Sequence, residues 1–153
     1  LQKHVLEFAL KARDKGIGIG LGIGGIEADF PPELFTETFA EANERGLFVV
    51  AHAGETAGAD SIKDALRYLK AKRLGHGIRV LENNSLVEEL QKAQIPLEVS
   101  PHSNYCLGVV KSTEPHPIRQ MIDAGLYCTL NSDDPSMFST NLNNEYLTLA
   151  AQG

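Results

Sequence analysis

Cysteine, positive charge and long apolar runs are all scarce in this sequence. Its two cysteines, Cys106 and Cys128, form no Cys-x-x-Cys pattern and have no spacing that demands a disulfide. We therefore expect reduced thiols and a cytoplasmic protein. Lys and Arg number 14 against 20 Asp and Glu, and this acidic balance offers no broad footprint for nucleic acid or for an anionic membrane surface.

No apolar run approaches the roughly 20 residues of a transmembrane helix, and no basic segment precedes an apolar one in the manner of a signal peptide. The chain begins at Leu1 rather than Met, so we expect the natural N-terminus to be missing. The 153 residues are 42% hydrophobic and 22% charged, as in ordinary globular proteins. They suffice for one domain with a core, and no linker divides them.

One unit recurs along the chain: an apolar run rich in β-branched residues ends in a polar or Gly-rich tip, and an amphipathic helical stretch follows. Such alternation predicts βαβ units and a parallel sheet. The predicted strands are Gly16–Gly24, Leu47–Ala53, Arg73–His76, Ile95–Ser100 and Leu126–Asn131. The predicted helices are Gln2–Lys15, Pro32–Arg45, Ser61–Lys70, Ser85–Ala93 and Pro117–Ala124.

Two α/β architectures fit this pattern. A parallel sheet of five strands can stand alone as a doubly wound fold, whereas a closed (β/α) barrel needs eight strands. The residues at the strand ends favour the barrel. We therefore expect an α/β fold of the parallel TIM-barrel type that is incomplete, with about five of eight βα units, in a single domain over residues 1–153.

Polar residues gather at the carboxyl ends of the predicted strands, where parallel α/β folds place their active sites. His52 lies at the end of the run Leu47–Ala53, and Glu55 follows past a glycine, where the chain turns toward the next helix. A carboxylate beside a histidine at a strand end is a common arrangement of a metal ligand and a base. Taken alone, Glu55 is better explained as a helix-entry carboxylate.

Two further strand ends carry ionisable side chains. His76 lies between two glycines, which let a ligand approach the backbone closely, although a tight turn around a buried histidine also explains the pattern. Asp133 and Asp134 follow the last predicted strand, and Pro135 keeps Asp134 out of the helical region, so the two carboxylates point in different directions. One can bind a metal and the other a substrate, or both belong to a surface turn.

Two imidazoles and three carboxylates at one rim of a sheet fit metal-assisted hydrolysis. The motifs around them, in order and spacing, resemble those of the adenosine deaminase family. They are HAGE at His52–Glu55, GHG at Gly75–Gly77, EVSPHSN at Glu98–Asn104 and NSDDP at Asn131–Pro135. The resemblance covers essentially the whole chain and implies the C-terminal portion of one (β/α)8 barrel domain with a single zinc ion at its carboxyl rim.

The resemblance also implies roles for the motif residues. His52 and Asp133 correspond to zinc ligands, and Glu55 corresponds to the acid that donates a proton to purine N1. A carboxyl pKa raised by burial would suit that donor. His76 corresponds to the histidine that orients the attacking hydroxide and stabilises the developing charge.

Two more residues correspond to substrate contacts. Asp134 is similar to the aspartate that hydrogen-bonds N7 of the purine, and Gly25 is similar to a glycine whose backbone amide contacts N3. The cysteine ligands and the Pro-Cys-x-x-Cys signature of cytidine-deaminase-type zinc enzymes are absent from the sequence.

The family draws two further zinc ligands from a His-x-His pair at the first barrel strand, and this sequence has no such pair. We expect the pair to lie in a missing N-terminal segment, because tight zinc sites have three or four protein ligands. Of the remaining histidines, His4 is expected in solvent, His102 is not counted as a ligand, and His116 is assigned a structural role at a helix entry. The open edges of an incomplete barrel also predict self-association.

The leading hypothesis is zinc-dependent hydrolytic deamination of a 6-aminopurine nucleoside, of the adenosine-to-inosine type, with release of ammonia. The Gly-rich loop at Gly20–Glu27 resembles the nucleoside enzymes, whereas the stretch Asp133–Tyr146 resembles bacterial members that include aminodeoxyfutalosine deaminases. Alternatives are therefore 6-aminodeoxyfutalosine or adenine within the family, and another metal hydrolase of the same barrel superfamily. An alternative of another class is a catalytically inactive, self-associating fragment.

Overall fold

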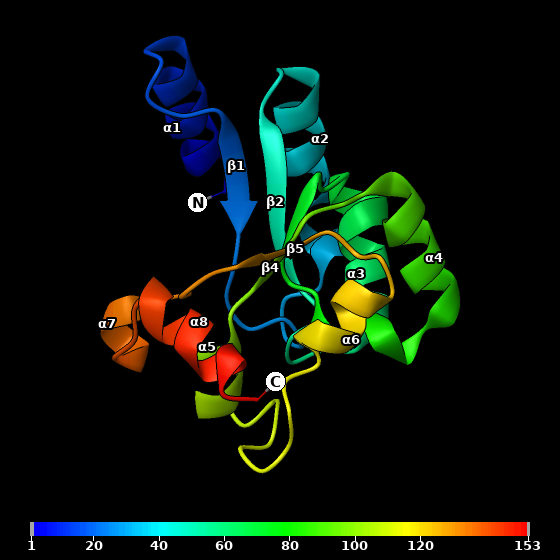
Figure 1. Cartoon of the computed structure of the whole chain (residues 1–153). Coiled ribbons are helices and arrows are strands. Elements are labelled where there is room, and N and C mark those ends of the chain that lie inside the picture. Colours follow the sequence, from blue (N-terminus) through cyan, green and yellow to red (C-terminus); the bar gives the residue numbers. More distant parts are fainter. Residues whose placement is uncertain (1, 153) are drawn as a thin grey trace.

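Five parallel strands lie side by side in the order in which they occur in the chain (Figure 1). The computed structural model describes residues 2–152. The strands are β1 Gly20–Ile23, β2 Phe48–Ala53, β3 Arg73–His76, β4 Leu97–Val99 and β5 Cys128–Leu130. Each pairs in parallel with the next, so β1 and β5 form the two edges of the sheet. The predicted parallel α/β sheet is confirmed, and the paired segments are shorter than most of the predicted runs.

Helices precede, connect and follow these strands. They are α1 Gln2–Asp14, η1 Pro32–Phe35, α2 Thr36–Glu44, α3 Ala59–Asp64, η2 Ala65–Leu69, η3 Ile78–Glu82, α4 Asn84–Ala93, α5 Pro101–Cys106, α6 Ile118–Asp123, α7 Pro135–Phe138 and α8 Leu142–Ala150. In Figure 1, α2, α3 and α4 lie along one side of the sheet, and α5, α7 and α8 gather beyond the ends of the strands. Among residues 2–152 no helix is both long enough and apolar enough to cross a membrane.

The two faces of the sheet differ in burial. In β2, the side chains of Val49, Ala51 and Ala53 are buried, while Val50 and His52 point the other way and stay partly exposed. The buried face packs against apolar residues of the helices, including Leu6, Leu10, Phe39, Ala42, Ile62, Leu69, Leu86 and Leu90. The hydrophobic core therefore lies between sheet and helices, and the other face of the sheet stays open.

The open face carries the polar pair Arg73 and Glu98, from β3 and β4. Arg73 Nη1 donates to Glu98 Oε1 across 3.3 Å, and both side chains are about one-third exposed. Adjacent parallel strands bring the two residues together, although they lie 25 positions apart in the sequence. The pair lies within the strands, whereas the remaining polar residues gather at the carboxyl ends of the strands.

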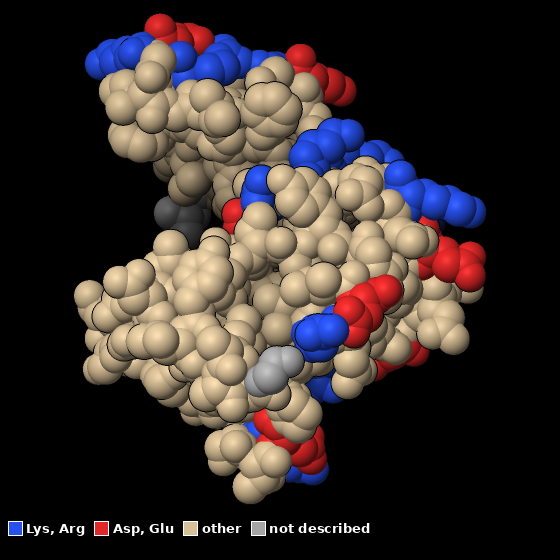
Figure 2. All heavy atoms as spheres, viewed as in Figure 1, with Lys and Arg blue, Asp and Glu red and all other residues tan. Residues whose placement is uncertain are grey.

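The surface charges are unevenly spread. Figure 2 shows Lys and Arg over the end of the molecule formed by α1, and an almost uncharged face over α7 and α8. The helices α7 and α8 expose the apolar side chains of Met137, Leu142, Tyr146 and Leu147. Since α8 contacts β5, these helices adjoin one edge of the sheet.

Candidate active site

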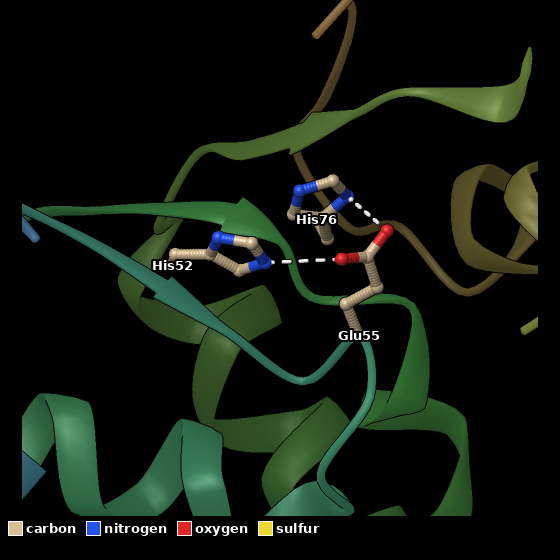
Figure 3. Close-up of side chains that lie close together, drawn as sticks. All are labelled: His52, Glu55 and His76. Carbon is tan, nitrogen blue, oxygen red and sulfur yellow. Dashed lines mark hydrogen bonds and ion pairs between the residues drawn. The ribbon is translucent and has the colours of Figure 1, made fainter. Parts of the chain in front are cut away.

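Glu55 is a buried carboxyl group at the carboxyl end of β2. The strand ends at Ala53, and Gly54 then adopts a φ of 73°, which turns the chain back on itself at little cost because glycine has no Cβ. This turn brings Glu55 to 2% exposure, with its Oε2 3.1 Å from His52 Nε2 (Figure 3). The three-residue spacing of HAGE thus makes a direct contact between acid and histidine.

His76 closes the same cluster from the neighbouring strand. The register of β2 and β3 pairs Ala53 with His76 and His52 with Gly75. Because Gly75 has no side chain, the two imidazoles approach to 4.4 Å between ring centroids. His76 is 5% exposed, and its Nδ1 lies 3.1 Å from Glu55 Oε1 (Figure 3). Each carboxyl oxygen of Glu55 therefore faces one histidine.

Asn104 lies behind this cluster and is fully buried on α5. Its Nδ2 donates to Glu55 Oε1 across 2.6 Å and lies 3.3 Å from His76 Nδ1. Its Oδ1 is 3.1 Å from Nε2 of His116, which precedes α6. The sequence placed Asn104 only in a motif and gave His116 a structural role. In the structure the two residues form a hydrogen-bonded path to Glu55.

Three ionisable groups of the cluster have shifted pKa values. Burial lowers the pKa of His76, and the nearby Glu55 carboxyl partly opposes this shift. The hydrogen bond with Glu55 raises the pKa of His52. Burial raises the pKa of Glu55, but the hydrogen bond with His52 and the charge of His76 oppose it, and the net pKa lies below its usual value. The expected elevated pKa of Glu55 is therefore wrong for this arrangement, in which His52 Nε2 contacts the carboxylate.

The side chains of the adjacent aspartates Asp133 and Asp134 point in different directions, as expected from Pro135. Asp133 adopts a left-handed φ of 56°, and its Oδ2 accepts a 2.6 Å hydrogen bond from Ser103 and lies 3.8 Å from His76 Nε2. Asp134 is exposed and turns away, and its Oδ1 caps α7 by accepting from the backbone N–H of Met137. The structure thus brings Asp133 to the cluster, while Asp134 lies at the start of the next helix.

The loop after β1 contributes Glu27, to which the sequence assigns no role. Glu27 is 8% exposed, and its Oε2 accepts from the backbone N–H groups of Glu55, Thr56 and Ala57 at 3.1, 2.7 and 2.6 Å. This carboxylate therefore fixes the backbone turn that carries the acid. A glutamate at the end of a Gly-rich loop was the only signal in the sequence, and its partners lie 28 to 30 positions away.

Two hollows meet at His52. One, of about 160 Å³, is lined by Gly24, Gly25, Ile26, Glu27 and the aromatic rings of Phe30 and Phe35. The other is open, measures about 480 Å³, and is lined by His76, Glu98, Ser100, Asn131, Ser132 and Asp133. Gly25 has a φ of 124°, and a Cβ at this position would meet no atom within 4 Å. The loop thus leaves room beside His52.

The cluster also has donors for a metal ion. Within residues 2–152, His52, Glu55 and His76 form a group whose potential ligand atoms all lie within 4.8 Å of one another. Imidazole nitrogen and carboxylate oxygen are donors that zinc accepts in proteins. Asp133 adds a carboxylate near His76, with its Oδ2 held by Ser103. The donor types present fit a zinc ion.

Comparison with known proteins gives a consistent result. The family model described as adenosine deaminase matches residues 1–153. An adenine deaminase from Cupriavidus necator is 45% identical over 138 residues, a match that covers 90% of this chain and 39% of the relative. An aminodeoxyfutalosine deaminase from Streptomyces avermitilis is 41% identical over 140 residues, covering 92% of this chain and 39% of the relative.

Solved structures share the fold. An amidohydrolase from Burkhoderia ambifaria, solved with bound Zn, superposes with a TM-score of 0.86 at 28% identity. The match covers 97% of this chain and 43% of that structure. The chain thus spans about two fifths of the length of the curated relatives and corresponds to part of this solved fold, as the incomplete barrel predicted.

Proposed function

Because this chain belongs to the adenosine deaminase family, we propose that it carries the acid–base part of a site for the hydrolytic deamination of a 6-aminopurine. One observation carries the proposal: a buried carboxyl, Glu55, stands at a strand end between two imidazoles and an amide. General acid–base catalysis needs such a carboxyl held within hydrogen-bond reach of the proton it transfers.

The preferred substrates follow from the relatives. The two relatives named above act on adenine and on aminodeoxyfutalosine, so these two purines are proposed ahead of adenosine. A Cβ at Gly25 would meet no atom within 4 Å, and this open space favours a purine with a substituent. The open space at Gly25 fits aminodeoxyfutalosine or another 6-aminopurine nucleoside. Adenine is favoured by the higher sequence identity to the adenine deaminase, 45% against 41%.

Each residue of the cluster has a proposed task. Glu55 donates a proton to purine N1, and His76 orients the attacking oxygen and stabilises the charge that develops on it. Gly25 offers its backbone N–H to N3. For Asp134 to reach N7, its carboxylate must leave the N-cap of α7, which costs about 1 kcal/mol.

His52 and Asp133 would hold a single zinc ion, which supplies Lewis-acid activation of the attacking water. His52 Nε2 serves either Glu55 or a cation, and not both at once. With that nitrogen engaged elsewhere, Glu55 loses the hydrogen bond that most lowers its pKa, while burial still raises that pKa.

The assay is ammonia release from adenine, aminodeoxyfutalosine, adenosine and AMP by the zinc-loaded protein. We expect turnover of adenine or aminodeoxyfutalosine to exceed that of adenosine. Glu55→Gln should keep zinc and lose about 100-fold or more of kcat, while Glu88→Gln, an exposed glutamate on α4, should keep full activity. Absence of turnover with every purine would overturn the proposal and favour the catalytically inactive alternative.

Self-association is proposed for the two open edges of the sheet, β1 and β5. The exposed apolar side chains of α7 and α8, helices that adjoin the β5 edge, support the same idea. Light scattering during size-exclusion chromatography measures it, and a strictly monomeric protein at micromolar concentration would refute it. Both cysteines are unpaired, which supports a reducing compartment such as the cytoplasm.

A further inference from the structure

His116 lies outside both hollows that meet at His52, yet two hydrogen bonds in series join it to Glu55. It is 3% exposed and stands between Pro115 and Pro117, ahead of α6. The path runs from His116 Nε2 to Asn104 Oδ1, and from Asn104 Nδ2 to Glu55 Oε1, over 3.1 and 2.6 Å. The segment that precedes α6 is thereby connected to the carboxyl group of Glu55.

The tautomer of His116 follows from its other ring nitrogen. The backbone N–H of Ile118 donates to His116 Nδ1 across 3.1 Å, so Nδ1 carries the lone pair. Burial lowers the pKa of His116 to about 4, which keeps the ring neutral. A neutral ring with an accepting Nδ1 bears its proton on Nε2. His116 therefore donates to Asn104, and the direction of the first bond is set by the backbone.

The orientation of the Asn104 amide follows in turn. Its Oδ1 accepts from His116, so its NH₂ group points the other way and donates to Glu55 Oε1, with His76 Nδ1 3.3 Å from the same nitrogen. A rotated amide would set its Oδ1 against the carboxyl oxygen of Glu55 and its NH₂ against the N–H of His116. Both contacts would be unfavourable in a fully buried position.

The two oxygens of Glu55 are thereby made different. Oε1 accepts from the Asn104 amide and lies 3.1 Å from His76 Nδ1, whereas Oε2 lies 3.1 Å from Nε2 of His52, which lines both hollows. The hydrogen-bonded path from His116 thus holds the carboxyl group in one orientation, with Oε2 toward His52.

We propose that His116 is a positioning residue for Glu55 and acts through the side-chain amide of Asn104. This inference rests on the proposed function for its kinetic consequence, but its geometric part stands apart from activity. The two parts can therefore be tested separately.

The geometric test is long-range ¹H–¹⁵N spectroscopy of the histidine rings in the protein at neutral pH. We expect His116 to be neutral with its proton on Nε2. A proton on Nδ1, or a charged ring at this pH, would overturn the relay whatever the protein catalyses. If no 6-aminopurine is turned over, the proposed function fails. The tautomer of His116 still shows whether the hydrogen bonds from His116 through Asn104 to Glu55 are formed as described.

The kinetic test is a double-mutant cycle in the zinc-loaded protein. His116→Phe and Asn104→Leu should each lower kcat by about 10- to 100-fold, with KM changed about twofold or less. The double variant should lose no more than the larger single loss, because one residue acts through the other. Unchanged kcat in His116→Phe, or losses that multiply, would overturn the proposal.

Two further variants separate positioning from stability. Met121→Ala removes a fully buried side chain of α6, which adjoins His116, and should lower stability without lowering kcat below the unfolding temperature. His116→Gln keeps an N–H donor that can reach Asn104 and should recover part of the rate lost in His116→Phe. If His116→Gln is as slow as His116→Phe, although the unsubstituted protein shows the expected His116 tautomer, the positioning role is overturned and His116 contributes only packing.

Discussion

Asn104 Nδ2 donates to Glu55 Oε1 across 2.6 Å, although 49 positions separate the two residues in the chain. Asn104 lies on α5, which follows β4, whereas Glu55 lies two residues after the end of β2. Since parallel strands end at the same edge of a sheet, both side chains reach one buried point. The proposed acid is thus held by several elements, and each can be tested by substitution.

The carboxylate of Glu27 accepts hydrogen bonds from the backbone turn that begins at Glu55. Glu27→Gln removes the charge from an oxygen that accepts three backbone hydrogen bonds. Because such charge-assisted bonds contribute about 1.5–3 kcal/mol each, we expect a loss of about 2 kcal/mol or more in unfolding free energy, together with a lower kcat. Urea unfolding and steady-state kinetics measure both. Glu33→Gln, an exposed control on η1, should change neither.

Ser103 positions the proposed metal ligand Asp133. Its Oγ donates to Asp133 Oδ2 across 2.6 Å, and Ser103 is fully buried. Ser103→Ala should weaken zinc binding by about 10- to 100-fold, since hydrogen bonds to a ligand orient it. Competition with a zinc chelator measures the affinity. The matched change Ser85→Ala, at an exposed position of α4, is expected to leave it unaltered, and equal affinities in the two variants would contradict this role.

Gly54 and Gly16 share a left-handed backbone but differ in their surroundings. Both have φ near 70°, at 73° and 71°. A Cβ at Gly16 would meet no atom within 4 Å, whereas one at Gly54 would collide with Ile62 of α3. Gly16→Ala should therefore cost only the backbone strain, about 1–2 kcal/mol, and Gly54→Ala substantially more. Thermal unfolding compares them, and equal losses would show that Ile62 moves aside freely.

The buried His116 predicts a dependence of stability on pH. Its pKa is about 4 in the folded state against 6.5 for the ordinary group, so the unfolded chain binds the additional proton. Stability from this group is complete above pH 6.5, falls as the pH drops toward 4, and is constant below that, a loss of roughly 3 kcal/mol in total. Urea unfolding should show this slope, and His116→Phe should remove it. An identical slope in the variant would place the titration elsewhere.

The periodic pattern predicted the strands and most of the helices because apolar alternation is a local property. It placed Glu55, His76 and Asp133 at strand ends, and the structure brings these three side chains together. It missed the helix Pro101–Cys106, whose short polar sequence reads as a strand tip. It also missed α8, whose fully buried Glu145 bonds the backbone N–H of His102 and so fits no apolar pattern.

The sequence alone determined the parallel α/β order and the residue types at each strand end, since both depend on neighbours within a few positions. Only the tertiary structure decided what each group touches. Glu27 meets the Glu55 turn through the loop after β1, and His116 meets Glu55 through Asn104. These contacts depend on strand register and helix packing, which bring together side chains that lie far apart in the chain. The pKa of Glu55 depends on the same contacts, and burial alone predicts its direction wrongly.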